Sequence, residues 1–206
     1  METKRAQVLI KFGLVLLFMP VAHARAGEQF KLLNSITLEP EYHHAVTNFV
    51  LVTERKKVTF RPPADWALTS DPGTRTISLR SPNDRAALSF TLIPDDPSLN
   101  AALATATRPN DPKPEELRQR ALDLFPGALI LGEFPCFANG LQGRTFDLAF
   151  NGAGRTQALV RLAFVRYSDG VIQFRLATTA KFSDYHGAFT ALINSIQIEN
   201  LPPKKT

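Results

Sequence analysis

Two short segments contain the side-chain types that metal sites and nucleophilic catalysis use. In the first, Glu41, His43 and His44 offer carboxylate and imidazole groups that could bind zinc or copper. Adjacent histidines on a strand point in different directions, however, and no further pair of His or Cys follows at zinc-site spacing. The simpler interpretation is a solvated loop, so we expect no cofactor and keep a metal-handling role as the alternative.

The second segment holds Ser183, Asp184 and His186, the residue types of a hydrolase triad. They lie within one helical turn, whereas a triad converges from separate elements, and Ser183 is better explained as a helix N-cap. The chain also has no G-x-S-x-G motif. Residues 151–154 (Asn-Gly-Ala-Gly) lie between two expected strands and so lack the helix N-terminus of a phosphate loop. We therefore expect a protein that is not an enzyme, with a hydrolytic role kept as part of the alternative.

A single cysteine, Cys136, stands among the apolar residues Phe134, Pro135 and Phe137. Without a second cysteine it cannot form a disulfide within the chain. We interpret it as a small buried side chain, and an intermolecular or reactive thiol is the alternative.

The elements that must position these residues begin with a series of β-strands. Apolar and polar residues alternate there, and Pro-Pro, Asp-Pro-Gly and Ser-Pro-Asn-Asp turns separate the alternating segments. Residues 94–114 carry five prolines and are expected to form a loop, within which 99–107 could be a short helix. Pro114 then opens an amphipathic helix that ends at Pro126 and Gly127. The expected strands are 47–53, 57–61, 76–80 and 86–93.

Two hairpins follow, and their register can be predicted by matching apolar faces. Three-residue loops that end in Gly154 and Gly170 place the apolar side chains on one face and leave the other face only partly covered. The predicted opposite pairs are Phe150–Thr156, Leu148–Ala158, Phe146–Val160, Leu162–Leu176 and Phe164–Phe174.

In this register, Arg161 and Arg175 share the half-covered face with Asp147. The two arginines could accept an anionic ligand or an acidic surface of a partner protein. Alternatively, their aliphatic stems cover the sheet and their charges pair with Asp147. These three residues are the candidate binding site.

The last expected element is a helix that starts at Ser183 and buries one apolar stripe. With the strands, it predicts an α+β fold, an α/β/α sandwich with a largely antiparallel sheet, one inserted helix and a C-terminal helix. The residues of the stripe are Tyr185, Phe189, Leu192, Ile193 and Ile196.

The order of elements over roughly residues 46–198 resembles that of the PsbP and Mog proteins. An expected edge strand, 58–61, runs into Pro62-Pro63 and a tryptophan, and two strands, a helix, a long meander and a closing helix follow. The resemblance implies a binding or assembly module rather than an enzyme, with Trp66 as a core anchor and Pro63 as a turn former. The residues that carry the resemblance are Phe60, Pro63, Trp66, Phe189, Leu192, Ser195 and Ile196.

Residues 1–26 are expected to be a cleavable export signal. A basic start with Lys4 and Arg5 is followed, after Lys11, by an apolar run over 12–22 that is too short to span a membrane. Cleavage would leave a chain that begins at Arg25 or Gly27, and an uncleaved anchor is the alternative. Because no cysteine lies near the cleavage site, we do not expect a lipid anchor.

Removal of residues 1–26 would lower the formal net charge from +5 to +2, since this segment holds four basic residues and one acid. So small a charge argues against a nucleic-acid partner. We expect an exported, periplasmic or secreted, non-enzymatic binding or assembly-accessory protein of the cell envelope, whose partner is an unidentified protein or small ligand. The predicted organisation is signal 1–26, N-terminal extension 27–45, one domain 46–200 and tail 201–206.

Overall fold

The computed structural model describes residues 30–39, 44–94, 97–105, 115–151, 157–167 and 170–202. Within these ranges the chain forms two antiparallel sheets and three α-helices. The strands are β1 (Phe30–Glu39), β2 (His44–Thr53), β3 (Lys56–Phe60), β4 (Ala67–Asp71), β5 (Thr76–Arg80), β6 (Ala86–Pro94), β7 (Leu129–Ala138), β8 (Leu141–Asn151), β9 (Gln157–Tyr167), β10 (Gly170–Thr178) and β11 (Gln197–Asn200). The helices are α1 (Pro97–Thr105), α2 (Glu115–Leu124) and α3 (His186–Ser195).

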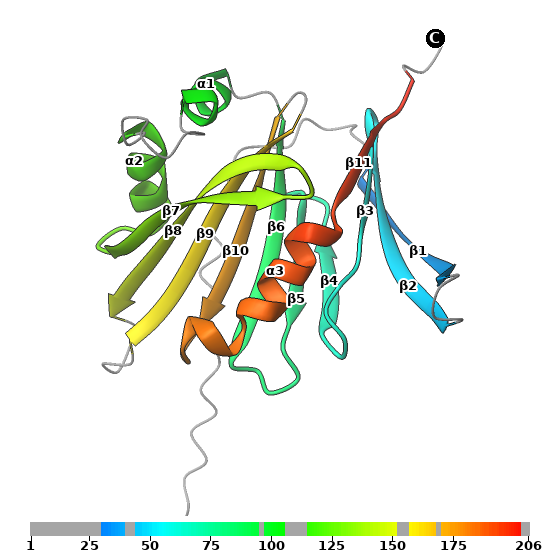
Figure 1. Cartoon of the computed structure of the whole chain (residues 1–206), viewed down its shortest axis with the longest axis horizontal. Coiled ribbons are helices and arrows are strands. Elements are labelled where there is room, and N and C mark those ends of the chain that lie inside the picture. The colour runs from blue at the N-terminus through cyan, green and yellow to red at the C-terminus, as the bar shows by residue number, and fades with distance from the viewer. Residues whose placement is uncertain are drawn as a thin grey trace, which may run out of the picture.

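The larger sheet has seven strands in the order β4-β5-β6-β10-β9-β8-β7, and the smaller has four in the order β1-β2-β3-β11 (Figure 1). All the neighbouring pairs are antiparallel, which confirms the predicted α+β class. The expectation that residues 58–61 form an edge strand is wrong, because β3 lies between β2 and β11. β1 lies within the predicted extension 27–45 and pairs with β2, while the domain boundary itself stays a prediction.

Polar side chains close the turns between the strands of the larger sheet. In the Asp-Pro-Gly turn, the Gly73 N–H donates to Asp71 Oδ1 at 2.9 Å, which is an Asx turn. In the turn before β6, the Ala86 N–H donates to Ser81 Oγ at 3.0 Å, and Asp84 takes a left-handed backbone with φ 55°. These turns stand where the sequence predicts them.

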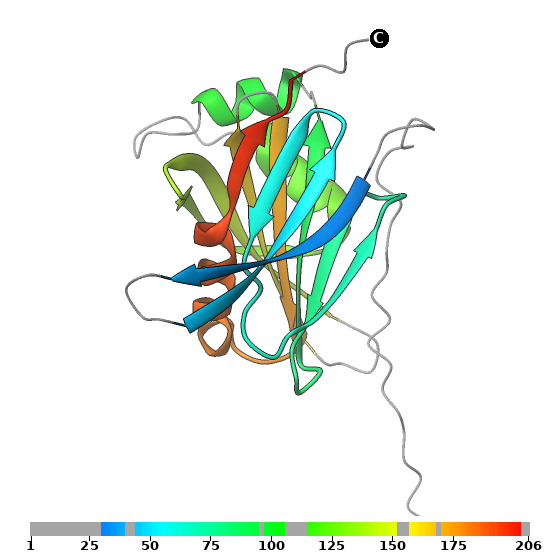
Figure 2. The same cartoon turned by 90° about the vertical axis from the view of Figure 1, so that its right-hand side faces the viewer.

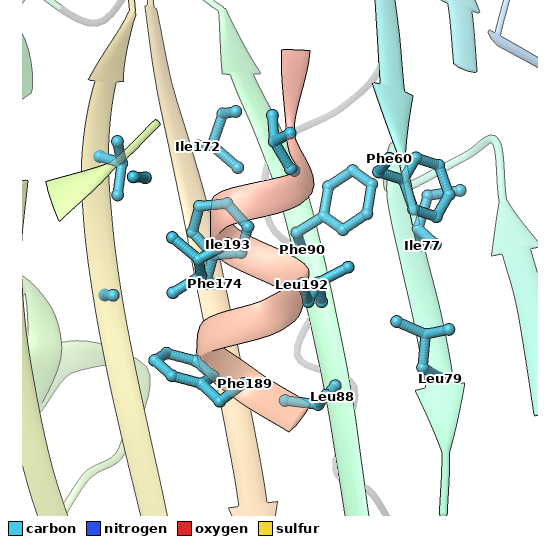
Figure 3. Close-up of a cluster of buried hydrophobic side chains, with 14 of the residues drawn as sticks. Phe60, Ile77, Leu79, Leu88, Phe90, Ile172, Phe174, Phe189, Leu192 and Ile193 are labelled. Atoms are coloured by element: carbon cyan, nitrogen blue, oxygen red, sulfur yellow. The ribbon is translucent and has the colours of Figure 1, made fainter. Parts of the chain in front are cut away.

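The main hydrophobic core lies between one face of the larger sheet and a layer made of the smaller sheet and α3. Phe60 of β3 meets Phe90 of β6 edge to face, with ring centroids 4.9 Å apart. Figure 3 shows Phe189, Leu192 and Ile193 of α3 directed at the strands beneath the helix. The predicted stripe on the closing helix is confirmed. Figure 2 looks onto the smaller sheet with α3 beside it.

The closing helix begins later than the sequence predicts. Ser183 lies in a short 3₁₀ helix, Phe182–Asp184, and Tyr185 occupies the N-cap position of α3 without a capping side-chain hydrogen bond. The Ser183 hydroxyl instead lies 3.3 Å from Asp184 Oδ1. After α3, β11 returns the chain to the smaller sheet; its four residues are too few to show a periodicity in the sequence.

A second cluster lies on part of the opposite face of the larger sheet, beneath α1 and α2. Leu99 and Leu103 of α1 and Leu117 of α2 are buried there against β8 and β9. Helices therefore lie on both faces, as an α/β/α sandwich requires. α1 overlaps the segment 99–107, for which the sequence allowed a short helix. No helix of the described residues is long and apolar enough to cross a membrane.

The hairpin registers differ from those predicted, and the second difference changes which residues share a face. β8 and β9 pair two residues further along, with Leu148 opposite Val160, so their faces stay as expected. Between β9 and β10 the displacement is one residue, which places Ala163 opposite Phe174. Since both faces of this sheet bury apolar side chains, matching of apolar faces cannot select the register.

Candidate functional site

The register places Arg161 and Arg175 on opposite faces of the larger sheet, which corrects their predicted common face. Arg161 lies opposite Leu176, a residue of the main core, so it points toward α3. Arg175 lies opposite Leu162, a residue of the second cluster, so it points toward the side of α1 and α2. The two arginines therefore have separate environments and separate roles.

Arg161 is fully engaged inside the fold. Its Nε and Nη2 donate to the two carboxylate oxygens of Asp147, each at 2.7 Å, and both side chains are largely buried. Its Nη1 lies 3.1 Å from His186 Nδ1, and the guanidinium lies over the rings of Phe134 and Phe182 at 5.3 and 4.8 Å. The pair thus holds the start of α3 against β8 and β9. The alternative interpretation expected both arginines to pair with Asp147, and Arg161 alone does so among the described residues.

The geometry of this region does not support the hydrolase hypothesis. Ser183 Oγ contacts its neighbour Asp184, while His186 turns to Arg161. For the metal hypothesis, Glu41 and His43 lie outside the described residues, and His44 opens β2 opposite Glu39. In the described part of the chain, no three His, Cys, Asp or Glu side chains gather closely enough to hold a metal ion. The metal hypothesis stays a prediction.

Arg175 has no protein partner for its charge among the described residues. The guanidinium carbon lies 4.8 Å from the centre of the Phe125 ring, just beyond the end of α2. Its Nε is buried and has no hydrogen-bond acceptor in the described ranges. Desolvation by burial lowers the pKa of the guanidinium from its ordinary value, although an arginine still stays charged at neutral pH.

Arg175 stands at the border between the part of its face that lies beneath α1 and α2 and the part that these helices leave uncovered. α1 and α2 lie over the β7–β9 end of the sheet (Figure 1), and α1 also contacts β10. No residue of β4 or β5 belongs to the cluster beneath the two helices. Over β4, β5 and the middle of β6 and β10, this face instead carries polar side chains in register across the strands, while Ile93 of β6 and Val171 of β10 belong to the covered cluster. We name these residues the polar half-face: Thr69, Ser78, Ser89, Thr91, Gln173 and Arg175.

Two rows make up the polar half-face. In one row, Ser78 lies between Thr69 and Ser89, and Ser89 lies opposite Arg175. In the next row Thr91 lies opposite Gln173, and its hydroxyl is 2.8 Å from that of Thr76. The sequence carries a signal for this face, because Ser and Thr alternate with Leu, Ile and Phe along β5 and β6. Only the correct register shows that Arg175 joins it.

No protein-family model and no curated protein matches the sequence. Among solved structures, one from Bacteroides thetaiotaomicron VPI-5482 is similar over 72% of this chain and 46% of its own, at 11% identity and a TM-score of 0.49. This chain thus spans about half the length of that protein. Cyanobacterial PsbP (CyanoP) of Synechocystis sp. PCC 6803 matches over 69% of this chain and 86% of its own, at 12% identity and a TM-score of 0.46.

The Saccharomyces cerevisiae Ran-binding protein Mog1p matches over 81% of this chain and 96% of its own, at 9% identity and a TM-score of 0.44. The chain resembles the PsbP and Mog proteins. At such identities and TM-scores the likeness describes the arrangement of elements, and no inference about function rests on it.

The positions that carry the PsbP/Mog resemblance have structural roles. Trp66 packs against the main core, and its ring meets that of Tyr185 edge to face, with centroids 6.1 Å apart. Its backbone N–H donates to Pro63 O at 3.4 Å across a turn. Ser195 Oγ accepts the Arg61 N–H at 2.9 Å and so ties the end of α3 to the chain after β3. These contacts support the implied roles of Trp66 and Pro63.

β7, at the edge of the larger sheet, carries most of the exposed large apolar side chains of the described residues. They are Leu129, Leu131, Phe134 and Phe137, and Leu33 of β1 is the other. Within β7, Cys136 is half-buried against the main core. Burial raises the pKa of its thiol, and the opposing effects of Thr145 and Arg144 are smaller. The thiol is therefore protonated at neutral pH, which fits a packing role better than a reactive one.

Proposed function

We propose that the chain is a non-enzymatic binding or assembly-accessory protein whose ligand contacts the polar half-face. The observation that carries the proposal is Arg175, a largely buried cation without an acceptor among the described residues, at the edge of a polar surface. A buried charge that lacks a partner is costly to the fold, so its presence is best explained by a partner that arrives from outside. The neighbouring hydroxyl and amide groups supply further hydrogen-bonding positions.

We also propose that this binding takes place in the cell envelope after export. The support is the pattern of residues 1–26, which has the basic start, apolar run and small-x-small sites of a cleavable signal. A cleaved chain carries a formal charge close to zero, which suits a protein or small-molecule partner better than a nucleic acid.

Site-specific photo-crosslinking in the native compartment tests both points, because it captures small molecules as well as proteins. A photoreactive residue would replace Thr69 on the polar half-face, Phe137 on β7 or, as the control, Arg85 in the turn before β6; all three side chains are exposed. We expect an adduct at position 69 and none at 85, on a chain whose first residue is Arg25 or Gly27. Adducts at 137 alone would move the binding surface to β7 and contradict the proposal.

A further inference from the structure

We propose that Arg175 binds the carboxylate of a small, polyhydroxylated organic acid that lies along the polar half-face. This inference rests on the proposed function, because it names the ligand of the same surface. It is carried by three features of the described residues: one cation without a counter-charge, neighbouring hydroxyl and amide groups, and the absence of large apolar side chains among the named residues of this surface.

The charges around Arg175 favour a single negative charge on the ligand. Of the other charged residues that β4, β5, β6 and β10 place on this face, Arg80 lies 3.8 Å from Asp84, and Asp71 accepts hydrogen bonds within its own turn. Arg175 therefore offers one positive charge, which a carboxylate balances. A phosphate monoester carries nearly twice that charge and is usually met by more than one cation.

The environment of the guanidinium favours a bound anion in two ways. Phe125 covers one side of the group, so water screens its charge less than it would on an open surface. Nε is the buried donor without an acceptor, so the outer Nη groups are the donors that a ligand can reach. Two Nη–H groups can meet the two oxygens of a carboxylate in the bidentate geometry that arginine favours.

The residues next to Arg175 favour hydroxyl groups on the rest of the ligand. Ser89 lies one strand away and Ser78 two strands away, which is roughly 10 Å from Arg175 at the usual strand spacing. The side chains of Ser78, Ser89 and Gln173 make no hydrogen bond with other described residues. An extended six-carbon hydroxy acid could reach from Arg175 to Ser78. A protein interface would instead call for exposed aromatic side chains, which gather on β7.

Calorimetric titration of the purified protein with gluconate at low salt tests the proposal. Loss of one charge-assisted bidentate pair should weaken gluconate binding at least ~10-fold in Arg175→Gln, and less in Arg175→Lys, which keeps the charge but not the fork. Arg85→Gln, which removes an exposed arginine from the turn, should bind like the unmodified protein. Sorbitol, hexanoate and inorganic phosphate should each bind at least ~10-fold more weakly than gluconate. Sorbitol lacks the carboxylate, hexanoate lacks the hydroxyls, and phosphate lacks the single charge.

Ser78→Gln provides a second variant, because it fills the far end of the surface without altering the arginine. It should also weaken gluconate binding, and circular dichroism would verify that each variant is folded. Equal binding of gluconate to Arg175→Gln and the unmodified protein would overturn the proposal, as would tighter binding of phosphate. Absence of gluconate binding together with a crosslink at position 69 would remove this ligand class and leave the proposed function standing. Absence of both gluconate binding and the crosslink at position 69 would contradict this proposal and the proposed function alike.

Discussion

Replacement of Asp147 by alanine should lower the free energy of unfolding by about 3 kcal/mol. The change removes the carboxylate that accepts two 2.7 Å hydrogen bonds from Arg161, and it leaves that guanidinium largely buried between two aromatic rings. Removal of one partner from a buried ion pair costs roughly 3–5 kcal/mol, and the remaining contact with His186 keeps the loss near the lower figure. Urea unfolding followed by circular dichroism measures the change.

Glu199→Ala is the matched control, because it breaks an ion pair of similar length on the surface. Lys57 Nζ lies 3.0 Å from Glu199 Oε2, and the two side chains are 38% and 60% exposed. Exposed pairs contribute roughly 0–1 kcal/mol, so this variant should unfold almost as the unmodified protein does. If Asp147→Ala were as mild as the control, Arg161 would not hold α3 in place as described.

Gly143→Ala should be similarly damaging, at about 3 kcal/mol or more, for a steric reason. A Cβ at this position of β8 would clash with the Phe164 carbonyl oxygen and lie 2.9 Å from Cys136 Sγ. The first contact is with the backbone of β9, so the strand pairing would have to shift. Overpacking of a core commonly costs about 1–3 kcal/mol, and a clash with backbone stands at or above the upper end. Thermal and urea unfolding would both show the loss.

Gly187→Ala is the control for this prediction. Gly187 lies in the first turn of α3, and a Cβ there meets nothing within 4 Å. Alanine favours a helix over glycine, so this variant should be more stable by roughly 0.5–1 kcal/mol. Equal effects of the two glycine substitutions would show that β8 and β9 do not approach each other as closely as described.

Local patterns predicted much of the fold. The stripe Phe189, Leu192 and Ile193 identified the face of α3 that packs on the sheet, and the alternation along β5 and β6 identified those strands. β7 was not expected, because Gly132 and Pro135 interrupt its pattern and a register irregularity lies between Ile130 and Gly132. Such features are common on edge strands, where they hinder pairing with other chains, and they weaken the strand signal in the sequence.

The candidate site depended on a tertiary feature that the sequence does not carry. Arg161 and Arg175 are of one residue type, lie on neighbouring strands and follow similar apolar patterns, yet they face opposite layers. β9 and β10 carry apolar residues on both faces, so a shift of one residue leaves the pattern plausible. The position of α1 and α2 on one part of the sheet, so that these two helices do not cover the polar half-face, is likewise set by packing between distant segments.

We propose that Arg175 serves a ligand rather than the fold, and equilibrium unfolding of Arg175→Met in the absence of ligand tests this role. Methionine keeps an apolar stem against Phe125 and removes the buried donor that lacks an acceptor. Removal of an unsatisfied buried donor should stabilise the fold by about 1–3 kcal/mol. Loss of the contact between the cation and the ring should destabilise it by about 0.5–1 kcal/mol. The variant should therefore be more stable than the unmodified protein by about 1 kcal/mol. A loss of stability of that size or larger would show that the guanidinium holds the structure together and would contradict the claim.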